Sequence, residues 1–134
     1  MKALVCSDFG STQDLTLEQR EDLEPGAGEV LIDVKAAGVN FPDILTVEGK
    51  YQFKPELPFI PGTEVSGVVT KLGKGVATRK VGDEVVGMVQ IGGFASQVVT
   101  SEYTTFPKGS SMSYEQAAGF AVTYGTSYYA LKQR

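Results

Sequence analysis

The stretch EVLIDVKAAG, residues 29–38, carries the clearest structural pattern in the chain. Val30, Ile32, Val34 and Ala36 recur with a period of two, which is typical of a β-strand with one buried face. Further short β-branched runs predict strands at residues 2–6, 15–21, 65–72, 84–89 and 95–100. Glycine-containing turn segments separate these runs, at residues 25–28, 73–75, 82–83 and 92–93. We therefore expect a mainly β protein with short helices, built as a compact barrel or sandwich.

Two segments break the strand pattern and predict helices. In NFPDILTVEG, residues 40–49, Asn40 suits an N-cap, Pro42 suits a first turn, and Gly49 suits a C-terminal stop. This predicts a short helix over residues 42–48. Near the C-terminus, Ser113 followed by Gln116 forms a capping-box pattern, which predicts a helix that ends near residue 119.

A last helix is predicted from about Gly125 to the end of the sequence. Tyr124, Tyr128 and Leu131 have the i, i+4, i+7 spacing that puts them on one face. The sequence ends on residues 132–134 with no glycine cap and no proline. Two explanations of this apolar face stay open: it packs on the domain's own barrel, or the chain is a fragment and a missing domain covers it.

Composition limits the function classes. The 134 residues suffice for one domain with a hydrophobic core. The net charge is −4 and the basic residues are scattered, which argues against nucleic acid and anionic membranes as partners. No apolar run resembles a signal peptide or reaches membrane-span length, and the single cysteine excludes an intrachain disulfide. We expect a cytoplasmic protein.

The absence of histidine excludes several kinds of site. Neither a Ser-His-Asp triad nor a Cys-His pair can be built. A zinc site would have to rely on Cys6 and carboxylates, so we expect no metal. The two G-x-G segments, at residues 26–28 and 73–75, lack the third glycine of a dinucleotide-binding loop, and no P-loop spacing is present.

The segment AAGVNFPDILTVEGKY, residues 36–51, followed by PFIPGTEVSGVV, residues 58–69, resembles the medium-chain dehydrogenase/reductase superfamily. The resemblance is greatest to its zinc-independent quinone oxidoreductase branch. MKALV, PGAGEV, VGDEV and YGTSYYAL extend it over nearly the whole chain. It implies a GroES-like, partly open β-barrel joined to a Rossmann domain. Residues 1–122 would be the GroES-like catalytic domain, and residues 123–134 a helix leading to a nucleotide-binding domain absent from this chain.

The resemblance also implies loss of the catalytic metal site. Zinc-dependent relatives hold the metal with a cysteine, a histidine and a second cysteine, and these positions match Asn40, Thr63 and approximately Val122. Only the neighbouring Glu64 remains as a metal-ligand type. Amide and hydroxyl oxygens replace thiolate and imidazole poorly as zinc ligands. The resemblance therefore implies a reductase without zinc.

By the same resemblance, NADPH would supply the hydride to a quinone or enone, and hydrogen-bond donors would stabilise the charge that develops on the carbonyl oxygen. Asn40 and Tyr51 would be catalytic and face the substrate, while Asn40 and Thr126 would contact the nicotinamide. NADP would be held mainly by the absent domain. The substrate pocket would comprise Asn40, Phe41, Asp43, Tyr51 and Thr63.

Each of these residues also has a purely structural interpretation. Asn40 would serve as the helix N-cap, Asp43 would favour the helix dipole, Tyr51 would belong to the core or the surface, and Thr126 would be an ordinary helix residue. For Glu64 we expect a structural role at the floor of the cleft. Its carboxylate would be partly buried and held by backbone N–H groups or by an arginine, either the chain's own last residue or one outside this chain.

Two functions stay open at this stage. The first is the catalytic-domain portion of an NADPH-dependent oxidoreductase for quinones or other α,β-unsaturated carbonyls, inactive without a nucleotide-binding domain. The alternative is a stand-alone GroES-like binding module that associates through its C-terminal helix. A homodimer is compatible with either function.

Overall fold

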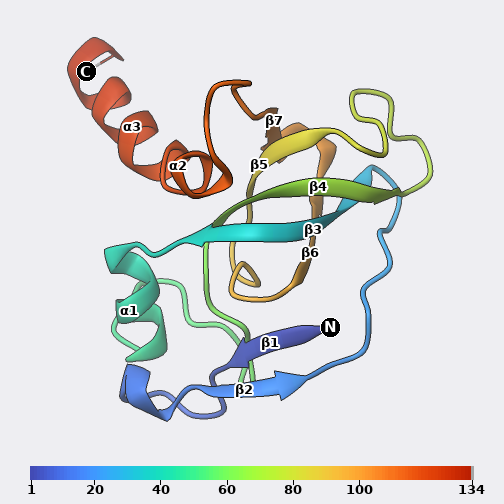
Figure 1. The fold of residues 1–134 in the computed structure, drawn as a ribbon. Helices are drawn as coiled ribbons and strands as arrows, with labels where there is room; N and C mark the ends of the chain where they lie inside the picture. Colours follow the sequence, from blue (N-terminus) through green and yellow to red (C-terminus); the bar gives the residue numbers. More distant parts are fainter. Residues whose placement is uncertain (134) are drawn as a thin grey trace.

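The structure is a computed structural model that describes residues 1–133, with seven strands in two antiparallel sheets. The smaller sheet pairs β1 (Lys2–Val5) with β2 (Thr16–Gln19). The larger sheet has the order β6-β3-β4-β5-β7. Its strands are β3 (Glu29–Gly38), β4 (Glu64–Leu72), β5 (Glu84–Met88), β6 (Gln97–Ser101) and β7 (Thr105–Pro107). The sheets stay open rather than closing into a barrel (Figure 1), so the prediction of a mainly β, partly open fold is confirmed.

The core lies on the β3–β4 pair at the centre of the larger sheet. Val30 and Ile32 of β3 are completely buried and Val34 packs against the same cluster, as predicted. The two-residue alternation then breaks at a register shift between Val34 and Ala36, so Ala37 rather than Ala36 packs on the core. β-branched side chains of the neighbouring strands complete this cluster, namely Val65, Val69, Val85 and Val98. Burial of each such side chain stabilises the fold by about 1.5–3 kcal/mol. The β3–β4 pair is thereby fixed as the frame on which the adjoining loops are placed.

Two of the three α-helices match the predictions closely. Helix α1 (Phe41–Val47) follows β3, and α2 (Tyr114–Ala118) begins with the predicted capping box. The Ser113 hydroxyl accepts from the Gln116 N–H at 3.2 Å, and the Gln116 side chain accepts from the Ser113 N–H at 3.0 Å. Two short 3₁₀ turns, Thr12–Asp14 and Glu102–Thr104, complete the connections. Helix α2 ends before Gly119, as predicted.

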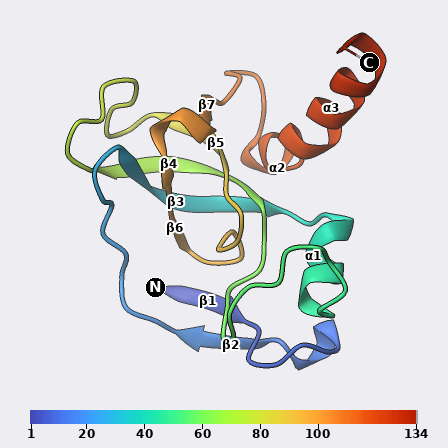
Figure 2. The ribbon, with the colours of Figure 1, turned by 180° about the vertical axis from the view of Figure 1, so that it is seen from behind.

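The last helix differs from its prediction. Helix α3 (Ala121–Tyr128) begins at Ala121 rather than near Gly125, and it continues into a π-helical turn, Tyr129–Gln133. The reason is a cap from outside the helix: the Glu64 carboxylate accepts from the N–H of Val122 in the first turn. No residue of α3 is buried, and the helix projects away from the sheets (Figures 1 and 2).

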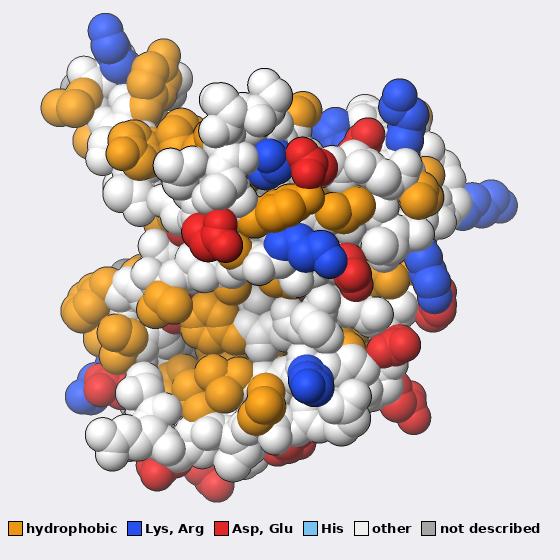
Figure 3. Space-filling view, viewed as in Figure 1, with side chains coloured by type: hydrophobic (Ala, Val, Ile, Leu, Met, Phe, Trp, Pro, Cys, Tyr) orange, Lys and Arg blue, Asp and Glu red, His pale blue; other side chains and the backbone are white. Residues whose placement is uncertain are grey.

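Hydrophobic side chains gather on α3 and around α1 in the space-filling view (Figure 3). Tyr124 and Tyr128 are each 61% exposed, and Leu131 is 84% exposed, so the predicted apolar face of α3 does not pack on the described part of the chain. Within residues 1–133, no helix has the length and apolar character needed to cross a lipid bilayer.

Candidate functional site

A cavity of about 370 Å³ lies where α1, the start of β4, the end of β5 and the start of α3 meet. We call it the Asn40 cavity. Five neutral polar and five apolar residues line it: Asn40, Thr46, Tyr51, Thr63 and Gln90, and Pro42, Phe53, Met88, Val89 and Val122. No charged side chain is among these described lining residues. The cavity is therefore suited to an uncharged, largely apolar molecule with one or two hydrogen-bonding groups.

Below this cavity, Glu64 joins three elements through its carboxylate. The side chain is only 1% exposed at the start of β4. Its Oε1 accepts from Asn40 Nδ2 at 3.0 Å, and its Oε2 accepts from the Val122 backbone N–H at 2.9 Å. The expectation of a backbone N–H partner is confirmed, and the carboxylate is more deeply buried than we expected. The arginine suggested as its partner, Arg134, lies outside the described residues.

A second buried carboxylate, Asp43, lies at the start of α1. Its Oδ2 accepts from the Asn40 backbone N–H at 2.8 Å, as the third residue of a capping box does, so Asn40 is the predicted N-cap of α1 while its side-chain Nδ2 donates to Glu64. Burial raises the pKa of Asp43, and repulsion from Glu64 adds to this effect, whereas hydrogen bonds from the Asn40 backbone and the Thr63 side chain oppose it. Asn40 is thus held by two carboxylates, one through its backbone and one through its side chain.

The structure brings together some of the residues predicted for the site and separates others. Asn40, Tyr51 and Thr63 line the same cavity. Asp43 lies beside it, lining a neighbouring hollow of about 250 Å³. Phe41 is 71% exposed and is not among the lining residues. Thr126 is exposed on α3 and is also not among them, because the earlier start of α3 puts Val122 at the cavity.

Sequence reasoning missed the wall of the cavity that β5 supplies. Met88, Val89 and Gln90 line the cavity because Met88 lies opposite Glu64 in the β4–β5 register. The pairing register is a tertiary property, and no motif in the sequence marks it. Phe53 was equally missed, although its place two residues after Tyr51 was a usable signal.

The residues around Glu64 fit a metal ion poorly. Among residues 1–133, no group of three or more histidine, cysteine, aspartate or glutamate side chains is placed to hold one. Both oxygens of Glu64 already accept N–H donors. Asn40 and Thr63 add only an amide and a hydroxyl, which are weak zinc ligands.

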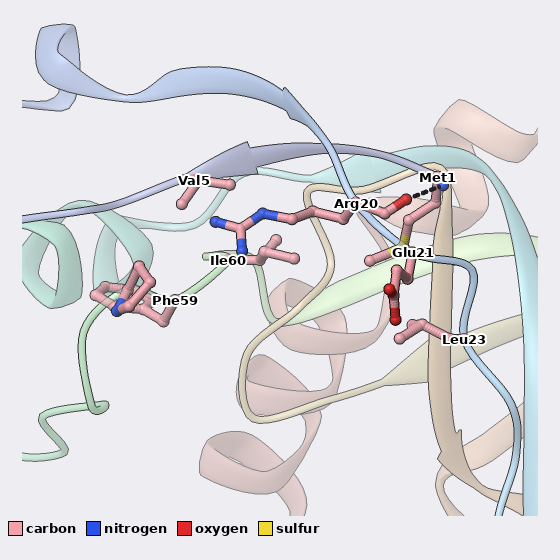
Figure 4. Close-up of a pocket in the computed structure, with 8 residues that line it drawn as sticks. Met1, Val5, Arg20, Glu21, Leu23, Phe59 and Ile60 are labelled. Atoms are coloured by element: carbon pink, nitrogen blue, oxygen red, sulfur yellow. Dashed lines mark hydrogen bonds between the residues drawn. The ribbon is translucent and has the colours of Figure 1, made fainter.

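A different cavity of about 420 Å³ lies beside the N-terminal strand, and none of the predicted site residues lines it. Figure 4 shows the Arg20 side chain reaching along this cavity toward Val5 and Ile60. The Arg20 guanidinium is paired with Glu18 at 2.8 Å, and the terminal ammonium group is paired with Asp22 at 2.7 Å. Both cations among the described lining residues therefore already have a carboxylate partner.

Known proteins resemble this chain over nearly its whole length. The alcohol dehydrogenase GroES-like domain family matches residues 26–128. The quinone oxidoreductase-like protein 2 homolog of Nematostella vectensis is 42% identical over 135 residues, covering 99% of this chain. The chain spans only 36% of that relative's length.

Two solved structures show the same relationship in three dimensions. The human synaptic vesicle membrane protein VAT-1 homolog-like protein superposes with a TM-score of 0.96 at 34% identity, with 99% of this chain and 43% of that chain covered. The Escherichia coli quinone oxidoreductase, solved as a complex with NADPH, superposes with a TM-score of 0.94 at 30% identity. In that case the match covers 99% of this chain and 41% of the other.

Proposed function

Because this chain belongs to the alcohol dehydrogenase GroES-like domain family of the medium-chain dehydrogenase/reductase superfamily, we propose that it is the catalytic-domain portion of a zinc-independent, NADPH-dependent oxidoreductase. Its substrates are quinones or related α,β-unsaturated carbonyl compounds. The observation that carries this proposal is the uncharged Asn40 cavity in a chain whose relatives include quinone oxidoreductases.

The lining of the cavity supports an uncharged carbonyl substrate. Phe53, Met88 and Val89 offer apolar contact to a planar ring. Asn40 and Tyr51 offer an amide N–H and a phenolic O–H, either of which can donate to a carbonyl oxygen. Such donors stabilise the negative charge that develops on this oxygen during reduction, and they act more strongly in a cavity shielded from water.

The same lining fits only one end of the cofactor. When bound, NADPH supplies the hydride. Neutral polar groups such as Asn40 and Thr63 suit its uncharged carboxamide end, and Thr126 is proposed to contact this end from α3. No basic side chain lines the cavity within the described residues, so the phosphates of the cofactor would be held outside this chain. The isolated 134 residues are therefore expected to bind substrate and to lack turnover.

Independence from zinc is supported by the donor set. Zinc in catalytic sites takes three protein ligands, usually histidine, cysteine or carboxylate. At the positions of interest the chain has Asn40, Thr63 and Val122, while the Glu64 oxygens accept hydrogen bonds. The proposed chemistry therefore stabilises the oxyanion by hydrogen bonding.

The test is a titration of the ¹⁵N-labelled chain with duroquinone, a tetramethyl quinone. We expect chemical-shift changes at the Asn40 side chain and at Thr63 and Met88, and an affinity about two- to tenfold weaker in Asn40→Ala. The variant Leu17→Ala, at a 71% exposed position of β2, serves as the control and should bind as the wild-type chain does. Saturable binding that leaves all the lining residues unperturbed, or no binding at all, would overturn the proposal.

A second candidate function is favoured by the exposure of α3. Tyr124, Tyr128 and Leu131 present apolar surface that the described residues do not cover, as expected of a module that associates through this helix. Light scattering coupled to size-exclusion chromatography separates the two functions. A stable oligomer that dissociates when Tyr128 and Leu131 are made polar supports association, whereas a monomer indifferent to the change rejects it.

A further inference from the structure

Glu64 is a buried carboxylate to which the proposed chemistry gives no step of its own. It lies on the central strand β4, between Gly38 of β3 and Met88 of β5. No ion pair to it occurs within the described residues, yet it is 1% exposed. Burying an unpaired carboxylate is costly unless hydrogen bonds compensate for the lost hydration. Its two N–H donors, from Asn40 and Val122, therefore stabilise its placement.

The first donor fixes the orientation of an amide. A carboxylate only accepts hydrogen bonds, so it selects the Nδ2 edge of Asn40 and rejects the Oδ1 edge. Asn40 Nδ2 carries two hydrogens, and Glu64 uses one of them. The second is left for an acceptor in the cavity that Asn40 lines. Glu64 thus determines which edge of this amide a ligand meets.

The second donor fixes the start of a helix. Phe120 stands at the N-cap of α3, and its side chain cannot accept a hydrogen bond from the first turn. Glu64 Oε2 supplies the missing acceptor at Val122, and its charge lies at the positive end of the helix dipole. Val122 also lines the Asn40 cavity, so the cap and the cavity share a residue.

The packing leaves the carboxylate little freedom. A Cβ added at Gly38 would lie 2.5 Å from Glu64 Oε1 and 2.8 Å from its Cγ. The absence of a side chain at Gly38 is what lets the carboxylate reach both donors.

We propose that Glu64 is a positioning residue that couples the Asn40 cavity to helix α3, by fixing the amide orientation of Asn40 and the first turn of α3 with the two oxygens of one carboxylate. A ligand that accepts a hydrogen bond from Asn40 in the cavity perturbs the hydrogen bond between Asn40 and Glu64. The same Glu64 carboxylate holds Val122. Ligand occupancy is thereby linked to the position of α3. The coupling of α3 to a bound ligand rests on the proposed function. The positioning of Asn40 and Val122 by the two hydrogen bonds of Glu64 does not.

The test uses Glu64→Gln, which keeps the size of the side chain and removes one acceptor. A glutamine amide offers one oxygen and one NH₂ group, so it cannot accept from both donors in their present orientations. Either the Val122 N–H loses its acceptor and exchanges with solvent about tenfold faster or more, or the Asn40 amide inverts and its side-chain NH₂ resonances shift. The readouts are amide hydrogen exchange and the NMR spectrum of the ligand-free 134-residue chain.

The matched control is Glu102→Gln. Glu102 is also buried, at 2% exposed, and accepts from the backbone N–H groups of Ala77 and Thr78. Since these bonds all go to Oε2, the single oxygen of a glutamine can replace it, so this variant should change exchange at residues 77–78 only slightly and leave Val122 and Asn40 unchanged. If Glu64→Gln leaves both the exchange rate of Val122 and the Asn40 side-chain resonances at their wild-type values, the positioning role is wrong.

Duroquinone provides the second arm of the test. In the wild-type chain, binding should shift the amide resonances of α3 as well as those of Thr63 and Met88. In Glu64→Gln, the shifts at Thr63 and Met88 should remain, while the response of α3 disappears and the affinity falls about two- to tenfold. A response of α3 that persists at full size in the variant rejects the coupling. Failure of duroquinone to bind the wild-type chain refutes the ligand-dependent half of the inference along with the proposed function, and the ligand-free arm still decides on the double hydrogen bond.

Discussion

Gly38→Ala is the substitution that most directly tests the packing beneath the site. Gly38 pairs with Glu64 across the β3–β4 ladder, and the new Cβ would lie 2.5 Å from Glu64 Oε1. It would approach the carbonyl oxygen of Ala118 in α2 even more closely. The second contact is with backbone, which cannot rotate away as a side chain could. Strand β3 and helix α2 would therefore have to separate.

The expected magnitude follows from two opposing effects. Overpacking a tight interior site costs about 1–3 kcal/mol. Replacing glycine by alanine recovers about 0.5–1 kcal/mol, because the unfolded chain loses conformational freedom and the φ of Gly38 lies outside the left-handed region. We expect a net loss of about 1–2 kcal/mol in the free energy of unfolding.

Urea denaturation followed by circular dichroism measures this loss. With a urea dependence of about 1–3 kcal/mol per molar, typical of a small protein, the midpoint should fall by about 0.3–2 M. Gly125→Ala is the matched control, because an added Cβ at Gly125 meets no atom within 4 Å and the residue lies inside α3. That variant should gain up to about 1 kcal/mol. A midpoint for Gly38→Ala at or above the wild-type value would refute the close approach.

Two further predictions concern pH. Burial raises the pKa of Asp43, so the stability contributed by its protonated form is present below its unfolded pKa of about 3.9 and is lost as the pH rises through the folded pKa. Asp43→Asn should therefore gain stability relative to the wild-type chain as the pH rises above about 3.9, measured by urea midpoints. A difference that stays constant with pH contradicts this. Hydrogen bonds from the side chain of Thr78, then from the backbones of Thr78 and Ala77, lower the pKa of Glu102. Its contribution is present above an unfolded pKa of about 4.3 and is lost as the pH falls through the folded pKa, so Glu102→Gln should be destabilising at pH 7 and neutral in strong acid. A thermal-denaturation series that shows an equal loss at both pH values rejects this assignment.

The elements that could be predicted from sequence are those with local signals. Strand β3 has a two-residue period, and α2 has both halves of its capping box within four residues. Strand β7, Thr105–Pro107, was not predicted, because three residues ending in proline carry too little periodicity to be recognised. The start of α3 was misplaced for a different reason: its capping acceptor is Glu64, which is remote in the sequence.

The residues of the candidate site likewise fall into those that the sequence could predict and those that it could not. Asn40, Tyr51 and Thr63 were placed on the pocket by a motif-based resemblance, and all three line the cavity. Met88 and Gln90 could not have been predicted, because they reach the cavity through the β4–β5 register. The partners of Glu64 were only half foreseen. A backbone N–H was expected, but no local pattern shows that the Asn40 amide would also donate to a residue 24 positions away.

The external cap of α3 has a consequence for the order in which the protein assembles. Glu64 and Val122 are separated by 58 positions in the chain, and α3 with its π-helical turn is short, spanning only residues 121–133. Helices shorter than about 12–15 residues are marginal in water, because nucleating the first turn is unfavourable. The acceptor that stabilises this first turn exists only after β3 and β4 have paired. We therefore expect helix α3 to form late, on a sheet that is already built, and a peptide of residues 113–133 alone to remain largely unfolded.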